Sequence, residues 1–141
     1  MTPLELVQQV YLSHSRRDTP MLLELLAEDV EWFEAQGHPY SGTGPWRGHD
    51  EIVANVVDPI NNDWIDYRTE VTDMYDAGDT IIVLGRYLGR YKSTGAQLDA
   101  KMCTIYTVRH GQIVKWRQYT DTYQFRSVMG LVDNSDSRRA R

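Results

Sequence analysis

Apolar and polar residues alternate along the C-terminal third of the chain with the two-residue period of β-strands. Over residues 97–108 this alternation places six residues on one face: Leu98, Ala100, Met102, Thr104, Tyr106 and Val108. After a predicted tight turn at residues 109–112, a second strand places Val114, Trp116, Gln118 and Thr120 on one face. One face of this hairpin is apolar with a few isolated polar groups, which is typical of the wall of a small-molecule pocket.

The N-terminal part of the chain has the spacing of amphipathic helices. Thr2 and Pro3 predict the start of a first helix, and its apolar stripe continues to His14. Thr19 and Pro20 predict a second helix that ends at residues 28–29 and leads into a short strand over residues 30–34. After a glycine-rich loop over residues 36–48, a third helix is expected from residue 49 to about residue 57.

Pro59 is expected to end that third helix, because proline lacks a backbone N–H. Strands are then predicted over residues 64–75 and 80–91, ahead of the C-terminal hairpin. Since helices come first and antiparallel strands follow, the order predicts an α+β fold. We expect a cone-shaped, curved antiparallel sheet with three helices on one face, in a single domain over residues 1–132. A disordered polar tail is expected over residues 133–141.

Composition and charge narrow the classes of partner. The net charge of −5 argues against nucleic acid or an anionic membrane as the main partner. A lone cysteine, Cys103, permits neither an intrachain disulfide nor a cysteine-based zinc cluster. We find no metal-binding motif, no phosphate loop, no signal peptide and no apolar stretch of about 18 residues. The expectation is a cytoplasmic protein that needs no metal and no cofactor.

Four segments of the chain together resemble one known family. They are LVQQVYLSHSRRDTPMLLELLAEDVEW, HPYSGTGPWRGHDEI, DAGDTIIVLGRY and TIYTVRHGQIVKWRQYTDT, and they span roughly residues 4 to 122. The chain resembles the SnoaL-like polyketide cyclase and ketosteroid isomerase-related group of the nuclear transport factor two-like superfamily. The resemblance implies the cone-shaped, cystatin-like fold but not the reaction, because that fold hosts isomerases, cyclases, epoxide hydrolases, dehydratases and non-catalytic binders.

A homodimer is predicted from aromatic residues on the second face of the sheet. Alternation assigns to that outer face Tyr67, Tyr87, Tyr91, Ile105 and Tyr119. A sheet with apolar residues on both faces usually has its second face covered. Members of the superfamily that the chain resembles often pair sheet against sheet, so the covering partner is expected to be a second copy.

Glu34 is the first candidate catalytic residue. The resemblance to ketosteroid isomerase places the proton-shuttling carboxylate at this position, at the end of the first strand. Neighbouring Trp32 and Phe33 would desolvate the carboxylate and raise its pKa, which suits proton abstraction next to a carbonyl. The alternative is a solvated acid at a loop entrance. The donors that this isomerase uses for its oxyanion have no counterpart, since their positions fall near Val10, one residue before Tyr11, and near Thr104. Steroid isomerase activity itself is therefore not expected.

Arg86 is the second candidate, because simple alternation puts it on the inner face with Leu84 and Leu88. It resembles the arginine of the limonene-type epoxide hydrolases. Leu88 and Gln118 stand where those enzymes have aspartates, so that mechanism is not expected here. The alternative role for Arg86 is a structural ion pair with Glu34 or Asp121.

The remaining candidates are polar or aromatic residues expected around the cavity. Gln118 is expected to orient a substrate carbonyl or hydroxyl, and Trp116 either to stack on the substrate or to pack in the core. His38 is a candidate acid or base near the cavity mouth, unless it is a solvated loop residue. The other predicted pocket residues are Met102, Thr104, Tyr106, Tyr11, His14 and Tyr40. Asp121 is expected to be structural or to lie at an interface.

Two function hypotheses follow, and they differ in what they predict for Glu34. The first is a cofactor-independent enzyme that performs acid–base chemistry on a small, largely apolar carbonyl or polyketide-like compound. The second is a non-catalytic module that binds a small molecule. An enclosed Glu34 with a raised pKa favours the enzyme, and a solvent-facing Glu34 beside an apolar cavity favours binding. A cavity filled by the protein's own side chains would instead indicate a dimerisation domain.

Overall fold

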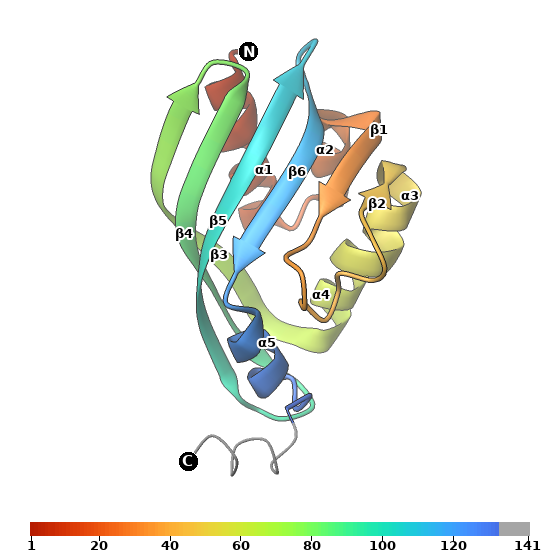
Figure 1. Cartoon of the computed structure of the whole chain (residues 1–141), viewed down its shortest axis with the longest axis vertical. Coiled ribbons are helices and arrows are strands. Elements are labelled where there is room, and N and C mark those ends of the chain that lie inside the picture. Colours follow the sequence, from red (N-terminus) through yellow and green to blue (C-terminus); the bar gives the residue numbers. More distant parts are fainter. Residues whose placement is uncertain (133–141) are drawn as a thin grey trace.

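Six strands form one curved sheet in the computed structural model, which describes residues 1–132. The strands are β1 (Leu26–Phe33), β2 (Trp46–Arg47), β3 (Trp64–Ala77), β4 (Thr80–Tyr91), β5 (Gln97–Arg109) and β6 (Gln112–Thr120). Their order across the sheet is β2-β1-β6-β5-β4-β3, so β2 and β3 are edges and the sheet is open (Figure 1). The pairs are antiparallel except for β1 and β6, which run parallel. The predicted α+β class is confirmed, while the predicted tail lies outside the described residues.

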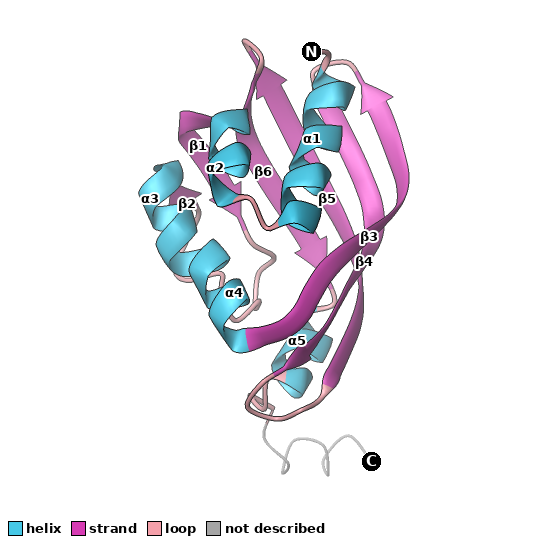
Figure 2. Cartoon of the chain, turned by 180° about the vertical axis from the view of Figure 1, so that it is seen from behind, coloured by secondary structure: helices cyan, strands magenta, loops and turns pink. Residues whose placement is uncertain are grey.

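Helices cover one face of this sheet (Figure 2). They are α1 (Pro3–Arg16), α2 (Thr19–Leu25), and a continuous helix made of α3 (Gly48–Ile52), a π-helical turn (Val53–Val57) and α4 (Asp58–Asp63). These correspond to the three predicted helices. A further short helix, α5 (Thr122–Val128), was not predicted and packs below the sheet (Figure 1). None of the helices among residues 1–132 is long and apolar enough to cross a membrane.

The N-terminal helices begin where capping chemistry places them. The Thr2 hydroxyl accepts from the Glu5 backbone N–H over 3.1 Å, while the Glu5 carboxylate accepts from the Thr2 N–H over 3.2 Å. The Asp18 carboxylate accepts from the Met21 N–H over 3.0 Å and starts α2. The predicted end of α2 was wrong, because β1 begins at Leu26, which is fully buried and pairs with β6.

Pro59 does not end the third helix, which continues to Asp63. The chain changes to a wider π-helical turn before the proline, and the Asp58 N–H donates to the Val53 carbonyl five residues earlier. Pro59 then lies just after the π-helical turn, and its missing N–H interrupts the hydrogen-bond ladder without ending the helix. The helix therefore extends along one side of the sheet and forms one wall of the space between the sheet and the helices.

The two faces of β4 are the reverse of those expected. Ile81, Val83 and Tyr87 are buried, whereas Arg86 is on the outer face. Pairing decides this, since Tyr87 lies opposite Ala100 on β5, and the even-numbered residues of β5 face the core as predicted. Apolar residues occur on both faces of β4, so simple alternation could not choose between them.

Bulges also change which residues of β3 and β6 point inward. The pairing of β3 with β4 shifts between Ile65 and Arg68, and Asp66 there has a φ of 55°. Trp64 and Tyr67 therefore both pack inside, with ring centroids 5.4 Å apart. A similar shift near Val108 buries Ile113 in place of the predicted Val114.

Three tyrosines expected on the outer face are therefore inside. They are Tyr67, Tyr87 and Tyr91, which belong to or pack against the core. Ile105 and Tyr119 remain on the outer face, and Tyr119 is 53% exposed. The aromatic side chains are thus concentrated between the sheet and the helices, where the cavity lies.

Candidate functional site

A cavity of about 150 Å³ lies between the inner face of the sheet and helices α1, α2 and the α3–α4 helix. Aromatic and aliphatic side chains make most of its wall: Tyr11, Leu22, Trp32, Val56, Val57, Ile60, Tyr67, Tyr87 and Trp116. Three polar side chains lie among them, namely His14, Glu34 and Gln118, and the rim includes Arg17, Asp18, Asn61 and Arg68. A cavity of this volume holds a molecule about the size of a benzene derivative.

Glu34 lies in this cavity directly after β1, and its side chain is only 2% exposed. The Trp32 indole N–H donates to Oε1 over 2.8 Å, while Oε2 makes no hydrogen bond among the described residues. Burial raises the pKa of Glu34 to about 7, and the bond from Trp32 opposes part of that rise. The carboxyl group therefore gains or loses a proton close to neutral pH, as the sequence suggested.

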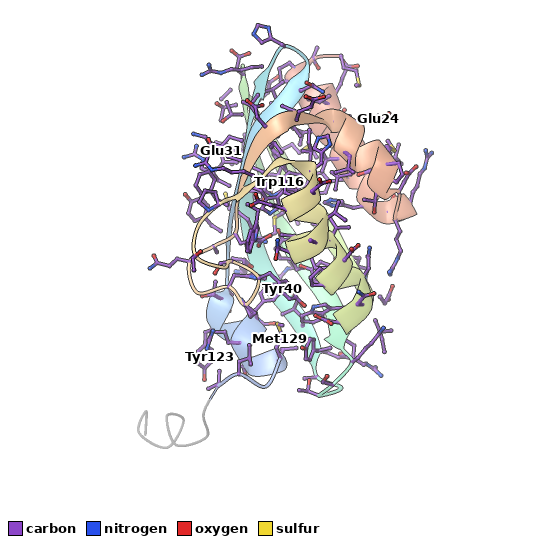
Figure 3. The ribbon with its side chains drawn as sticks, turned by 90° about the vertical axis from the view of Figure 1, so that its right-hand side faces the viewer. Glu24, Glu31, Tyr40, Trp116, Tyr123 and Met129 are labelled. Carbon is purple, nitrogen blue, oxygen red and sulfur yellow. The ribbon has the colours of Figure 1, made fainter. Side chains whose placement is uncertain are left out.

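Trp116 of β6 forms the centre of the wall (Figure 3). Its indole ring stacks on Trp32 with centroids 3.7 Å apart and an angle of 12° between the planes. It also meets Tyr106 edge-on at 4.6 Å. Trp116 thus does both things considered for it, because it packs in the core on one side and lines the cavity on the other.

Gln118 has a fixed orientation inside the cavity. Its Oε1 accepts from the Ala35 backbone N–H over 3.2 Å, and its Nε2 donates to the Tyr87 hydroxyl oxygen over 3.2 Å. The backbone N–H can only donate, so the amide oxygen of Gln118 must face Ala35. The amide nitrogen then faces Tyr87 and is the donor of the second bond. Gln118 therefore ties the segment after Glu34 to Tyr87 on β4.

His14 and Tyr11 reach the cavity from α1. Their rings meet edge-on at 5.6 Å, and His14 also lies 5.9 Å from the Trp116 ring. Burial lowers the pKa of His14 to about 4, so its imidazole is neutral at pH 7. The Tyr11 hydroxyl lies 2.6 Å from the hydroxyl of Tyr106 and shares a hydrogen bond with it.

Tyr106, Met102 and Thr104 are buried on the inner face of β5, as predicted, but none of them lines the cavity. Tyr106 is fully buried and contacts two residues of the cavity wall, Tyr11 and Trp116. The Thr104 hydroxyl is buried and makes no hydrogen bond among the described residues. These three residues support the wall from behind.

His38 and Tyr40 are not at the cavity mouth, so that expectation was wrong. His38 is 4% exposed and packs on Phe125 of α5 at 4.4 Å. Its Nδ1 accepts from the Tyr40 N–H over 3.0 Å and lies 4.0 Å from Glu34 Oε2. Burial lowers the pKa of His38 to about 4. Helix α5, which was not predicted from the sequence, covers this loop, and His38 is held behind Glu34.

Tyr40 instead holds the loop to the end of α4 (Figure 3). Its hydroxyl donates to the Asp63 carboxylate over 2.7 Å and accepts from the Trp64 indole over 3.1 Å. The Asp63 bond and burial both raise the pKa of Tyr40. Tyr40 is therefore a structural residue of the loop.

Arg86 does not reach the cavity, because β4 presents it on the opposite face of the sheet. Its guanidinium donates to the Asp99 carboxylate over 2.9 Å on the surface. An ion pair was the alternative role for Arg86, although the partner is Asp99 and not Glu34 or Asp121. Asp121 is structural, since its carboxylate accepts from the Gln124 N–H over 3.0 Å and starts α5.

The sequence did not predict most of the wall, and the aromatic residues that it missed are Trp32, Tyr67 and Tyr87. Trp32 was visible two residues before Glu34, a spacing that puts both side chains on one face of β1. Tyr67 and Tyr87 could not be found by alternation, because a bulge redirects one and apolar residues on both faces of β4 hide the other. Within residues 1–132, no three His, Cys, Asp or Glu side chains gather where they would hold a metal ion.

Comparison with protein families gives one match. The family described as the SnoaL-like domain matches residues 7–116, which is most of the chain. The resemblance stated from the sequence is confirmed. Among curated proteins, none is similar enough to count as a match.

Solved structures share the fold over almost the whole chain. An NTF2-like protein from Burkholderia thailandensis E264 is 34% identical, with 92% of this chain and 98% of that chain covered and a TM-score of 0.86. An NTF2-like protein of unknown function from Burkholderia pseudomallei K96243 is 26% identical, with coverage of 90% and 96% and a TM-score of 0.82. TerC, crystallised with polyporic acid, is 21% identical, with coverage of 91% and 98% and a TM-score of 0.80.

Proposed function

Because this chain belongs to the SnoaL-like domain family, we propose that it is a cofactor-independent enzyme that moves a proton next to a carbonyl group. The substrate is a small, largely apolar carbonyl or polyketide-like compound that fits the aromatic cavity. The observation that carries the proposal is Glu34, a carboxyl group enclosed in that cavity with a pKa of about 7. Such a group is a good acceptor and a good donor of protons at neutral pH.

The proposed reaction needs no co-reactant. Ionised Glu34 takes a proton from the carbon next to the carbonyl, and the electron pair of that C–H bond moves onto the carbonyl oxygen as an enolate. Protonated Glu34 then returns the proton to carbon, at the same or at another position. Glu34 ends each cycle ionised, and the substrate leaves exchanged or isomerised. The aromatic walls exclude water from the enolate while it exists.

The Trp32 indole supports this cycle by holding the carboxyl group in place. Its N–H donates to Oε1, while Oε2 has no hydrogen bond from the described residues. A buried oxygen without a partner is a stronger base than a solvated one, because no hydrogen bond stabilises its charge. Oε2 is therefore the proposed proton carrier.

Solvent exchange of substrate protons tests the proposal directly. Acetophenone and a panel of small ketones and enones are incubated with the protein in D2O, and NMR follows the loss of protons next to the carbonyl. The protein is expected to accelerate exchange, and Glu34→Gln to lower the rate by a factor of about 100 or more. Glu31→Gln is the matched control, since Glu31 lies on the same strand and pairs with Arg47 at the surface. Equal rates for the wild-type protein and Glu34→Gln would remove Glu34 from the mechanism.

The second candidate function is non-catalytic binding of a small molecule. It is favoured by the position of Arg86, which is outside the cavity and so leaves Glu34 without the charged partner considered for it. TerC, a structural neighbour, was crystallised with polyporic acid, which agrees with a ligand-binding use of the fold. A ketone that raises the melting temperature without exchanging its protons would support binding alone.

The homodimer remains part of the proposal. The outer face of the sheet has no helix over it in Figures 1 and 2, apart from α5 at one end, and it carries Ile105 and the half-exposed Tyr119. A second copy pairing face to face would bury these side chains. The cytoplasmic location stays a prediction from the sequence.

A further inference from the structure

Tyr87 has a hydroxyl whose proton is not used by the hydrogen bond it makes with Gln118. In that bond Gln118 Nε2 is the donor and the Tyr87 oxygen is the acceptor, over 3.2 Å. The direction is set one step earlier, because Gln118 Oε1 is engaged by the Ala35 backbone N–H. Tyr87 therefore keeps its own O–H to donate elsewhere.

The surroundings of Tyr87 indicate that the acceptor for its hydroxyl proton lies inside the cavity. Tyr87 lines the cavity together with Glu34 and is 7% exposed. The hydroxyl of neighbouring Thr104 lies close enough to act on the pKa of Tyr87, but it makes no hydrogen bond of acceptable geometry in the part of the chain that the structure describes. No other bond from the Tyr87 hydroxyl occurs among residues 1–132. A buried hydroxyl without an acceptor is costly, which indicates that a ligand supplies one.

We propose that Tyr87 is the hydrogen-bond donor to the ligand, and that the ligand presents a carbonyl or similar acceptor oxygen to it. The chain of bonds runs from the Ala35 N–H through the Gln118 amide to the Tyr87 hydroxyl and then to the ligand oxygen. Each group donates in the same direction, and such chains strengthen their last bond because each member polarises the next. This proposal rests on the proposed function, since the same oxygen becomes the enolate oxygen when Glu34 removes a proton.

Two features suit Tyr87 to this role. Burial holds its pKa well above the ordinary value, and the Glu34 charge adds to that rise, so the hydroxyl stays protonated while the base is ionised. The ring is also held in place, because it stacks on Tyr67 at 5.8 Å and meets Phe125 of α5 edge-on at 5.9 Å. A donor that does not have to reorient is the kind that stabilises developing charge best.

The base and the start of the donor chain lie on one stretch of backbone, while the donor Tyr87 itself lies on β4. Glu34 and Ala35 are consecutive, and the N–H that starts the donor chain belongs to the residue after the base. The ligand is therefore expected to lie between Glu34 and Tyr87, with its carbonyl oxygen on Tyr87 and the neighbouring carbon toward Glu34. Small ketones, aldehydes and enones with a planar apolar body fit both this polarity and the aromatic walls.

Matched pairs of probes test the donor separately from the base. Each ketone of the panel is compared with its methylene isostere, as in acetophenone against α-methylstyrene, and calorimetry or thermal shift gives the two affinities. The wild-type protein is expected to prefer the ketone about tenfold, which is the value of one hydrogen bond. Tyr87→Phe is expected to remove the preference. Tyr75→Phe is expected to keep it, because Tyr75 of β3 is 52% exposed and does not line the cavity.

The outcomes distinguish this proposal from the proposed function. A ketone preference that survives Tyr87→Phe overturns the role of Tyr87 and leaves Glu34 untouched. If Tyr87→Phe loses the ketone preference but Glu34→Gln leaves the rate of proton exchange unchanged, the donor role of Tyr87 is supported and the role of Glu34 as the base is overturned. A wild-type protein that prefers no ketone over its isostere overturns the donor. If Tyr87→Phe fails to fold, Gln118→Met replaces it and is expected to reduce the preference severalfold by removing the bond that Tyr87 accepts.

Discussion

The indole N–H of Trp32 donates to Glu34 Oε1 over 2.8 Å, between side chains two residues apart at the end of β1. This contact fixes the direction of the carboxyl group, and the Trp116 ring stacked on Trp32 at 3.7 Å fixes the indole in turn. The base of the proposed reaction is therefore positioned by aromatic packing and not by an ion pair. Its environment determines several properties that can be measured without knowing the substrate.

Glu34 is expected to make the folded state less stable as the pH rises. Its pKa is raised from 4.5 to about 7, so the folded protein holds a proton that the unfolded chain releases between these values. Stability is thus unaffected by this group below pH 4.5 and decreases as the pH passes through 7, by about 3 kcal/mol in total. Urea unfolding at pH 5 and pH 8 should show that Glu34→Gln gains stability on the wild-type protein at the higher pH. An equal difference at both values would contradict the raised pKa.

His14 and His38 are expected to act in the opposite direction. Burial lowers the pKa of each from 6.5 to about 4, so below pH 6.5 the unfolded chain binds protons that the folded protein does not. Each histidine should therefore cost about 2 kcal/mol of stability on going from pH 7 to pH 5. The variants His14→Gln and His38→Gln are expected to lose correspondingly less over this range. A wild-type NMR titration in which both imidazoles protonate above pH 6 would refute this.

Asp121→Ala is expected to destabilise the fold by about 1 kcal/mol through loss of the N-cap of α5. The conservative variant Asp121→Asn keeps an oxygen that accepts from the Gln124 N–H and should be nearly neutral. Because Phe125 of α5 packs on His38 and Tyr87, the alanine variant should also weaken ligand binding. Denaturant midpoints for the two variants check the first point, and ketone affinity checks the second.

Gly85→Ala is expected to be among the most damaging small changes, at about 3 kcal/mol or more. A Cβ at this position would lie 2.2 Å from the Glu70 carbonyl oxygen on β3, where the two strands approach beside a bulge. The nearest atoms all belong to the backbone of Glu70 and Val71, so no side-chain rotation can relieve the clash. Gly44→Ala is the control, since nothing lies within 4 Å of its added Cβ. Equal melting temperatures for the two variants would show that the strands separate easily.

Tyr119→Glu is expected to produce a monomer if the outer face of the sheet is the dimer interface. A charge placed at the centre of a face-to-face contact would be buried without a partner. Tyr123→Glu is the comparison, because Tyr123 is similarly exposed but belongs to α5. Sedimentation at micromolar concentration should give dimers for the wild-type protein and Tyr123→Glu only. A wild-type monomer would exclude the homodimer.

The sequence predicted those parts of the fold in which a single pattern decides the outcome. The β5–β6 hairpin has strict alternation and a turn at His110 and Gly111, both of which have positive φ, and the residues of β5 face as expected. On β6 the expectation holds from Trp116 onward, while the shift near Val108 buries Ile113 in place of Val114. Glu34 was found in another way, since the resemblance to ketosteroid isomerase implied its position, and its neighbours Trp32 and Phe33 then predicted its desolvation.

The parts of the fold and the site that the sequence did not predict depend on contacts between distant segments of the chain. On β4 both faces are apolar, so only pairing with β5 decides that Tyr87 points inward and Arg86 outward. His38 was expected near the cavity mouth, because nothing in its own loop predicts that α5 will cover it. The donor chain through Gln118 joins residues 83 and 31 positions apart, which no local pattern records.

The π-helical turn at residues 53–57 is a position at which the cavity wall can change while the residues of the proposed reaction stay the same. A π-helical turn holds one more residue than an α-helical turn, so deletion of one residue there would leave a regular helix. In the π-helical turn the Asp58 N–H bonds to the Val53 carbonyl five residues earlier, and after the deletion the same two residues would be four apart, as in an α-helix. Ile60 and Asn61, which follow the turn, would therefore keep their orientation, and the wall would change only at Val56 and Val57. Glu34, Gln118 and Tyr87 belong to the sheet side and would stay in place. A single codon lost at this site would thus reshape a small part of one wall around an unchanged reaction centre, which gives related proteins a short evolutionary path between substrates.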